Sequence, residues 1–500
     1  MTFFVWKGSI KMKNKKPVVI SLIVLVVVLL IGAGLVLFLE VGKKEETTEN
    51  TASSKYTTFA ELTSTQMFKD VPALIAEGTK IGSEFEYGDK HYTIDINGTT
   101  LKDYQDYLQL LEEAGYKKHS DNGEEGMDGY VYTTSFTKED STLTVYHITK
   151  YEKTYISSGK NEKLSDHLVY SDDYMAGAVA DAKTKVHMLE LNDNGNSFVI
   201  QLKNGNFIVE DGGTEADAPY LIDYLESLTP DGKKPVIEAW FMTHAHGDHY
   251  GALKKIMLTP EYVNRIYVEG VYFVDPSATV KEYFTKSEGS VSQAAWYVMN
   301  SANTFKQENG KNAEFYRPSL GQRYYFSDII IDIPFTMDQI TMDAYYSTDF
   351  NDTSLWIMHN IEGQRFLHAG DAGTTSTMMV MDFYDKEYFE LDMFSVLHHG
   401  INVFDYFTDY CTIKTLLYTN RTVGSLYSET KYARLEENAH LQESVVESVA
   451  HGDGTVIMTF PYEIGSYERA NPLDWKYTNG VRDNRIWDVV GGRDKDEPKE

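Results

Sequence analysis

The sequence predicts an α/β protein built on layered sheets between residues 180 and 465. Apolar, strand-like runs such as SFVIQLKNGNFIVEDGG and VIEAWFMTHAHGDH recur along this segment. Stretches with helical spacing, such as APYLIDYLESL and HYGALKKIML, lie between these runs. Histidines and aspartates cluster directly after apolar strands, which is where open sheets carry functional groups. These three observations together indicate an α/β fold with a reactive edge.

The N-terminus predicts a membrane anchor. Residues 1–16 form a basic stub, and the run from Val18 to Leu39 is uncharged throughout. Such a run crosses a hydrocarbon core of about 30 Å, so we predict a transmembrane helix over 17–39. A cleaved signal peptide is the alternative, but the run exceeds the usual apolar length of roughly 7–15 residues and no small-residue cleavage site follows it. The lysines place the N-terminus in the cytoplasm, whether translation starts at Met1 or Met12.

The charge of the chain is strongly asymmetric. The net charge is −29, and removing the five lysines of the stub leaves −34 for the rest of the chain. An acidic body disfavours long nucleic acids, which need basic surfaces, but does not exclude them. The one cysteine, Cys411, excludes an intrachain disulfide and favours the outer face of a bacterial membrane over a eukaryotic secretory lumen. We therefore expect a single-pass bacterial membrane protein with extracytoplasmic C-terminal domains.

Three segments flank the α/β region. Residues 40–85 begin with a charged, Ser/Thr-rich stretch and are predicted as a stalk and linker. Residues 86–158 predict a small α+β domain, with the helical stretch LKDYQDYLQLLEEAGY followed by two strands around the turn KED. Its histidines are isolated, so its role stays open between packing and ligand contact. Residues 466–500 are predicted as a polar C-terminal tail.

The segment FMTHAHGDHYGA, residues 241–252, holds the densest group of ligand-type side chains. His244, His246, Asp248 and His249 lie within six residues of one another, between an apolar strand and a helix. Neutral imidazoles and carboxylates are ligands for a borderline ion such as zinc. A polar surface loop is the alternative, but four such residues directly after a buried strand favour a metal site.

This segment resembles the H-x-H-x-D-H signature of the metallo-β-lactamase superfamily. Further segments are similar to the family's motifs in the same order. VEDGG at 209–213 resembles the family's strand-end Asp-Gly. FLHAGDAG at 366–373 resembles the strand whose aspartate, here Asp371, bridges two metals. VLHHG at 396–400 resembles the family's last metal motif. The resemblance implies a metallo-β-lactamase-like αββα sandwich over 180–465, preceded by the transmembrane helix and the small α+β domain.

The sequence departs from the family at one ligand position. Superfamily members usually supply a further histidine before the bridging aspartate, yet none lies between Tyr250 and Trp356. NDTS at 351–354 instead resembles the Asn-x-x-Ser pattern of the ComEC-type branch, which includes nucleases and secreted phosphodiesterases. We therefore expect Asn351 and Ser354 to contact substrate. His359 and His368 are alternative ligands, although a predicted hairpin favours packing or solvent exposure for both.

The resemblance implies two metal sites that share one aspartate. The first has only three protein ligands, which leaves the open position that a catalytic zinc needs. The second is completed by one histidine of the HHG pair, which we assign to His399. Zinc, in two copies, is the expected ion, with manganese or iron as alternatives. The expected ligands are His244, His246, Asp248, His249, Asp371 and His399.

Catalysis is assigned to Asp248, His398 and His399. One histidine of the HHG pair can ligate metal while the other holds a phosphoryl oxygen or protonates the leaving group. A metal-bound hydroxide would be the nucleophile, because bound metal lowers the pKa of water to about 7.

These assignments predict a membrane-anchored, extracytoplasmic metal-dependent hydrolase, best read as a phosphodiesterase or phosphoesterase. Its substrate would be an envelope phosphoester such as a teichoic acid, a lipid head group, a smaller diester or a nucleic acid. Two alternatives stay open: hydrolysis of a lactone, thioester or β-lactam in the same fold, and a catalytically degenerate surface sensor or scaffold. The walls of the pocket are expected from the region 260–345, whose aromatic residues either stack on substrate or pack in the core. These aromatic residues are Trp296, Tyr297, Tyr345 and Tyr346.

Overall fold

The computed structural model describes most of the chain between residues 55 and 470. The described residues are 55–63, 68–87, 91–171, 174, 177–179, 181–192, 195–275, 290–337, 350–400, 407, 410–421, 444–449 and 454–470. No helix within these ranges is long and apolar enough to cross a membrane. The transmembrane helix predicted over 17–39 and the stub before it lie outside the described residues.

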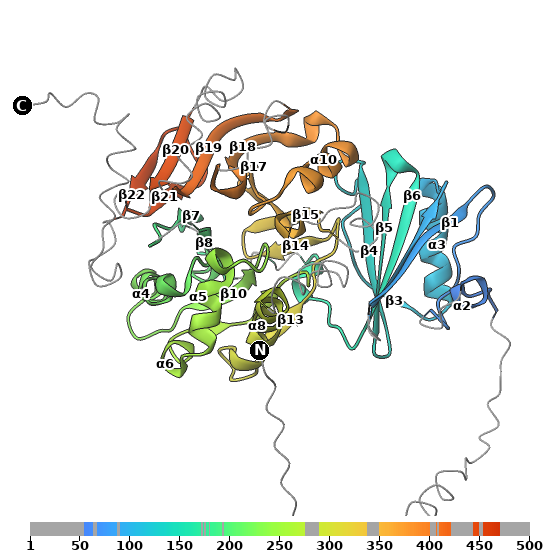
Figure 1. Ribbon diagram of the computed structural model, residues 1–500, viewed down its shortest axis with the longest axis horizontal. Helices are drawn as coiled ribbons and strands as arrows, with labels where there is room; N and C mark the ends of the chain where they lie inside the picture. The colour runs from blue at the N-terminus through green and yellow to red at the C-terminus, as the bar shows by residue number, and fades with distance from the viewer. Residues whose placement is uncertain are drawn as a thin grey trace, which may run out of the picture. The chain divides into compact units, whose positions relative to one another are not determined.

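A six-stranded antiparallel sheet comes first along the chain, in the order β1-β2-β6-β5-β4-β3. Figure 1 shows helix α3 (Leu101–Glu113) along one face of this sheet. The predicted helix and the two predicted strands around the turn KED are all found here. The strands are β1 (Lys80–Tyr87), β2 (His91–Asn97), β3 (Lys117–Asp121), β4 (Val131–Lys138), β5 (Ser141–Ile148) and β6 (Lys153–Lys160).

Helix α3 is held at its start by a capping box and along its length by an apolar face. The Thr100 side chain accepts a hydrogen bond from the Asp103 N–H at 3.1 Å, and the Asp103 carboxylate accepts one from the Thr100 N–H at 2.8 Å. Phe59, in the short helix α2 (Phe59–Leu62), and Phe68 pack in the same core as α3. The segment 40–85 was predicted as a stalk and linker, but part of it therefore folds into this core and into strand β1.

The first sheet of the α/β part has nine strands, in the order β13-β12-β10-β9-β8-β7-β21-β22, with β11 pairing beside β10. β9, β10 and β12 run parallel, so their C-terminal ends meet at one edge. β22 lies within the predicted tail 466–500, of which residues 471–500 are outside the described part of the chain. The strands are β7 (Lys185–Met188), β8 (Ser197–Gln201), β9 (Phe207–Asp211), β10 (Val236–Phe241), β11 (Tyr267–Val268), β12 (Gly270–Tyr272), β13 (Glu314–Tyr316), β21 (Val456–Thr459) and β22 (Tyr467–Arg469).

The second sheet has seven strands, in the order β14 to β20. β16 and β17 form the predicted hairpin, and β17, β18 and β19 run parallel. The strands are β14 (Arg323–Phe326), β15 (Ile329–Phe335), β16 (Trp356–Ile361), β17 (Gln364–His368), β18 (Glu390–Ser395), β19 (Thr412–Arg421) and β20 (Ser444–Val449).

An apolar core lies between the two sheets, and helices cover their outer faces. Phe198 and Phe241 from the first sheet pack in one cluster with Phe366 from the second. A second cluster joins the helices to the outer faces. The predicted mixed α/β fold of stacked sheets is therefore confirmed. The helices are α4 (Ala218–Leu228), α5 (Gly247–Met257), α6 (Pro260–Val263), α8 (Ser290–Thr304) and α10 (Thr374–Phe383).

Candidate metal centre

The histidine-rich loop connects the C-terminal end of β10 to helix α5. The helix begins at Gly247 with His246 as its N-cap, so Asp248 and His249 lie in the first turn. A carboxylate in the first turn of a helix is stabilised by the helix dipole. His244, three residues after the end of β10 at Phe241, is fully buried.

Asp371 and the HHG pair come to the same place from the second sheet. Asp371 follows β17, and His398 and His399 follow β18, which pairs with β17 in parallel. Gly370 permits the close approach of the two sheets, because a Cβ there would lie 2.5 Å from Thr243 Oγ1 and its φ is +50°. The site is thus assembled from strand ends of both sheets.

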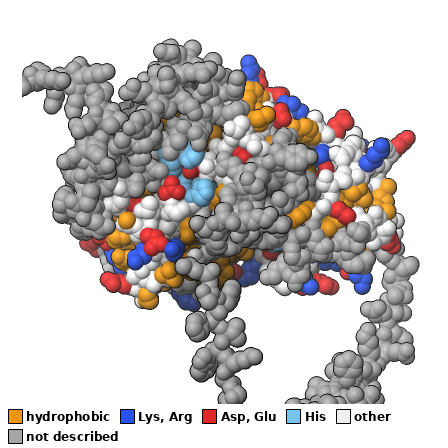
Figure 2. All heavy atoms as spheres, viewed as in Figure 1, with side chains coloured by type: hydrophobic (Ala, Val, Ile, Leu, Met, Phe, Trp, Pro, Cys, Tyr) orange, Lys and Arg blue, Asp and Glu red, His pale blue; other side chains and the backbone are white. Residues whose placement is uncertain are grey.

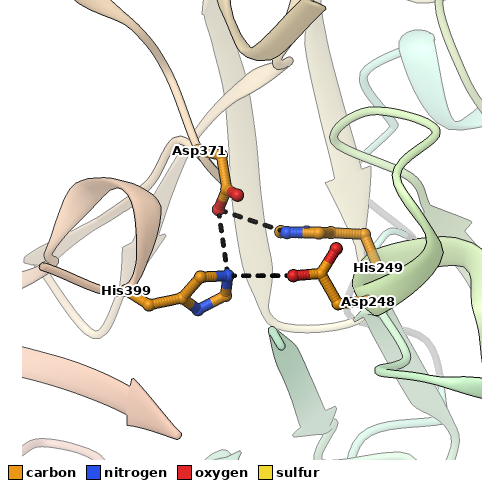
Figure 3. A group of neighbouring side chains, drawn as sticks. All are labelled: Asp248, His249, Asp371 and His399. Atoms are coloured by element: carbon orange, nitrogen blue, oxygen red, sulfur yellow. Dashed lines mark ion pairs between the residues drawn. The ribbon is translucent and has the colours of Figure 1, made fainter. Parts of the chain in front are cut away.

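Four of the predicted ligands face one another in one group (Figure 3). His249 Nε2 lies 3.2 Å from Asp371 Oδ1, and His399 Nε2 lies 3.4 Å from the same oxygen. His399 Nε2 also lies 3.5 Å from Asp248 Oδ2. Ligand atoms of a tetrahedral zinc with bonds of about 2.0–2.1 Å are separated by about 3.3–3.4 Å, so these spacings suit one ion.

The remaining predicted ligands form a second group that shares Asp371. His244, His246 and Asp371 place their ligand-type atoms close together. His244 Nε2 lies 2.9 Å from His246 Nδ1 and 3.9 Å from Asp371 Oδ2. Asp371 therefore turns Oδ1 to the four-residue group and Oδ2 to this one, as expected of an aspartate that bridges two metals.

The two histidines of HHG point to different sides of Asp371. Both have a left-handed backbone, with φ of 50° for His398 and 51° for His399. His399 is fully buried in the four-residue group, whereas His398 is partly exposed and its Nε2 lies 3.6 Å from Asp371 Oδ2. The structure therefore separates two residues whose roles spacing alone does not distinguish.

The residues present fit a metal. Three ligand atoms that face one another, His249 Nε2, His399 Nε2 and Asp371 Oδ1, are buried without a hydrogen-bond partner in the described part of the chain. Buried polar atoms normally find partners, so their convergence on one point suits a cation that would satisfy all three. Figure 2 shows histidine and acidic side chains gathered at the surface on this face.

Burial and charge divide the histidines into two kinds. Burial, with help from His249 and His246, holds the pKa of His244 well below its usual value, and burial also lowers the pKa of His246. Burial lowers the pKa of His399 too, but Asp371 and Asp248 outweigh it and raise this pKa to about 9. His244 and His246 are therefore neutral and ready to ligate at neutral pH, whereas His399 must release a proton when metal binds.

Two side chains behind the ligands are not evident from the sequence. Asp211, fully buried at the end of β9, lies with Oδ2 2.7 Å from His249 Nδ1. Thr419 Oγ1 lies 3.3 Å from His399 Nδ1. A partner on the second ring nitrogen fixes the tautomer and orientation of a ligand histidine. The segment VEDGG signals a strand end, but the contact to His249 becomes visible only when β9 and β10 are paired.

His359 and His368 do not fill the gap left by the absent family histidine. Glu210 accepts a hydrogen bond from His359 Nε2 at 2.6 Å and one from His368 Nδ1 at 2.8 Å. All three side chains are fully buried. Both histidines therefore pack in the core, and neither faces solvent.

Ser354 and Asn351, predicted to contact substrate, lie behind the histidine loop. Ser354 is fully buried, and its Oγ is 3.4 Å from His244 Nδ1, the ring nitrogen turned away from His246. Asn351 is half-buried in the otherwise buried turn η4 (Phe350–Thr353) before it. This position places Ser354 to orient His244, and substrate contact by Ser354 or Asn351 stays a prediction.

The expected aromatic wall is only partly described. Trp296 on α8 is 55% exposed, and Tyr297 packs against Lys254, whose Nζ is 5.1 Å from the ring centroid. Tyr345 and Tyr346 lie outside the described residues.

The sequence and fold are similar to known proteins. Residues 192–340 match the family model of the metallo-beta-lactamase superfamily, a span that includes the loop from His244 to His249. No curated protein matches the chain. This match confirms the resemblance to the metallo-β-lactamase superfamily over residues 192–340. Asp371 and the HHG pair lie beyond the matched span, and the likeness to the ComEC-type branch stays a prediction.

Solved structures with a similar fold come from several organisms. A zinc-bound PqqB from Methylobacterium extorquens has a TM-score of 0.32 at 9% identity, covering 53% of this chain and 98% of its own. A long-form RNase Z from yeast has a TM-score of 0.33 at 9% identity, covering 61% of this chain and 51% of its own. A metallo-beta-lactamase from Cronobacter sakazakii has a TM-score of 0.25 at 13% identity, covering 42% of this chain and 76% of its own.

Proposed function

We propose that this chain, whose residues 192–340 match the family model of the metallo-beta-lactamase superfamily, is a membrane-anchored, extracytoplasmic phosphodiesterase or phosphoesterase. The observation that carries the proposal is the pair of ligand groups that share Asp371. Two metals about 3.5–4 Å apart can clamp the attacking and leaving oxygens of a phosphodiester. The likeness of NDTS and HHG to the ComEC-type branch supports a phosphoester over a β-lactam.

The chain's own residues hold and orient the reacting groups. Bound metal ions would supply Lewis acidity and an activated water at neutral pH. Asp371 would present one oxygen to each ion, and Asp211 would keep His249 with Nε2 free to ligate. His398, partly exposed at the rim, is placed to donate to a phosphoryl oxygen or to protonate the leaving group.

The proposal includes two zinc ions, with manganese or iron as alternatives. It also places the helix over 17–39 in a bacterial membrane, with the N-terminus in the cytoplasm. The expected substrate is then an envelope phosphoester or a small diester, and the acidic charge disfavours long nucleic acid.

The test is metal content and diesterase activity of the purified full chain. We expect about two metal ions per chain and hydrolysis of bis(p-nitrophenyl) phosphate. Asp248→Ala and Asp371→Ala should lose metal and activity together, whereas Asp231→Ala, at an exposed turn, should keep both. Full activity in the Asp248 and Asp371 variants would sink the proposal.

A substrate panel distinguishes the alternatives. A lactone, a thioester and a chromogenic β-lactam are offered under the same conditions. Faster turnover of any of these than of the diester would assign a different bond to the same centre. Full metal occupancy with no turnover of any ester would favour a sensor or scaffold.

A further inference from the structure

The six-stranded sheet has two chemically different faces. The opposite face from α3 carries hydroxyl groups on neighbouring strands, where Thr142 pairs with Gly159 and Thr144 pairs with Ser157. Burying such a face gains little from the hydrophobic effect, yet Thr142 is 7% and Thr144 6% exposed. The face under α3 is apolar and carries Tyr92, Ile94, Leu143, Val145 and Ile156.

A cleft with about 580 Å³ of empty space, part of it open to solvent, lies over these hydroxyl groups. Its second wall comes from the segment 317–320 of the hydrolase part. Hydrogen bonds join the two walls beside the cleft: Thr133 Oγ1 donates to Leu320 O at 2.9 Å, and Gln322 Nε2 donates to Ser135 Oγ at 3.2 Å. The cleft is therefore fixed between two connected walls.

Charged side chains also line the cleft. Arg317 Nη1 donates to His91 Nδ1 at 2.9 Å, and His91 Nε2 faces Glu162 Oε1 at 2.9 Å. Lys163 lies on the same lining. Gly159 makes room for this arrangement, because a Cβ there would collide with the Glu162 side chain. The lining thus combines two cations and one carboxylate with a patch of hydroxyl groups.

The lining hydroxyls retain hydrogen-bonding capacity. The Thr144 hydroxyl lies 3.1 Å from that of Ser135, and the Ser157 hydroxyl lies 3.1 Å from that of Thr93. A hydroxyl donates once and accepts twice, so each can take a further partner. Sugars and polyols present hydroxyl groups that match such a surface, and a guanidinium favours phosphate oxygens.

The cleft lies at the edge of the sheets that carries the metal ligands. Val274 in its lining is two residues beyond Tyr272, whose carbonyl accepts the Met242 N–H at 2.9 Å, just before the histidine loop. Thr336, also in the lining, directly follows β15, which pairs with β16 close after Ser354. A ligand in the cleft would therefore approach the metal centre along the same edge.

We propose that this cleft binds a sugar phosphate or polyol phosphate unit. The hydroxyl groups of Thr144 and Ser157 hydrogen-bond the sugar or polyol, and Arg317 binds the phosphate. The ligand class follows from the cleft alone. The inference that the bound unit is the non-reacting part of a substrate rests on the proposed function.

The experiment is calorimetric titration of the metal-loaded full chain with glucose 6-phosphate, glucose and inorganic phosphate. We expect saturable binding of glucose 6-phosphate that exceeds binding of either part. Arg317→Gln should weaken it at least about tenfold and Thr144→Val about three- to tenfold, since hydrogen bonds to charged groups contribute more than neutral ones. Ser141→Ala, on the same strand but on the face toward α3, is the matched control and should bind normally.

Two further outcomes test the location of the ligand. Asp371→Ala should still bind glucose 6-phosphate, because the cleft does not depend on the metals. Loss of binding in this variant, or unchanged binding in both Thr144→Val and Arg317→Gln, would overturn the proposal. Asp371→Ala should also lose hydrolysis of bis(p-nitrophenyl) phosphate. This one variant therefore separates failure of the cleft proposal, seen as lost binding of glucose 6-phosphate, from failure of the proposed diesterase, seen as retained hydrolysis.

Discussion

Replacing Asp211 with asparagine tests whether the buried carboxylate behind His249 prepares the metal site. Asp211 Oδ1 accepts the Thr243 N–H at 2.8 Å, and Oδ2 accepts the His249 Nδ1–H at 2.7 Å. Both oxygens of Asp211 accept from N–H donors. An asparagine carries an NH₂ group in place of one oxygen, so in either orientation this group faces the N–H of Thr243 or of His249. If His249 instead accepts from that NH₂ group, its proton moves to Nε2, the nitrogen that should ligate metal.

We expect Asp211→Asn to weaken metal binding 10–100-fold, the usual effect of losing an outer partner of a ligand histidine. This factor corresponds to about 1.4–2.7 kcal/mol of binding free energy. The variant should also lose about 1.5–3 kcal/mol of stability without metal, because a hydrogen bond to a buried charge is removed.

The assay is metal affinity by competition with a chromogenic chelator, beside thermal unfolding of the metal-free protein. Asp217→Asn is the matched control, because Asp217 is also fully buried and accepts hydrogen bonds from Asn192 and Thr214 at 2.7 and 2.8 Å. The control should lose stability but keep metal affinity. Equal metal affinities for wild type and Asp211→Asn would refute the reasoning.

Three further predictions concern the same chain. His399→Ala should lose metal, whereas His398→Ala should keep metal and lower kcat by about 10²–10⁴-fold. Equal metal loss in both variants, measured by elemental analysis, would contradict the assignment of His399 as ligand and His398 as catalytic residue. Chelation should lower the unfolding temperature and zinc should restore it, since an ion at 1,000 times its Kd stabilises by about 4 kcal/mol; calorimetry with and without chelator would show an unchanged transition if no site exists. Burial, with Glu238 and Glu308, raises the pKa of Glu269 to about 7, so the native state keeps a proton that the unfolded chain releases near 4.5, and stability falls as pH rises through this window. Glu269→Gln should therefore raise the unfolding temperature relative to wild type at about pH 8 but not at about pH 5, and an equal shift at both would remove Glu269 as the cause.

The ligand residues were predictable because their chemistry is local in sequence. One loop holds His244, His246, Asp248 and His249. Because this loop connects a strand to a helix, it lies at the C-terminal edge of the sheet, where functional groups gather. Asp371 required the resemblance, because a single aspartate after a strand has no distinctive signal of its own.

The supporting contacts were not predictable because they join residues far apart in the chain. Asp211 meets His249 only through the parallel pairing of β9 with β10. The separation of His398 from His399 depends on two consecutive left-handed residues, which no residue-type pattern requires. Ser354 matched a substrate-binding pattern, yet the approach of η4 to the histidine loop places its hydroxyl against His244.

The position of the centre between the two sheets links metal binding to folding. His249 comes from the first sheet, whereas Asp371 and His399 come from the second, and Gly370 brings the two together. Without a cation, the interface between these strand ends holds buried carboxylates against imidazoles with unsatisfied nitrogens, an arrangement whose desolvation cost exceeds that of an apolar contact. A bound ion would satisfy these atoms from both sheets at once. Metal affinity and the free energy of unfolding should therefore change together in any variant that moves one sheet edge relative to the other.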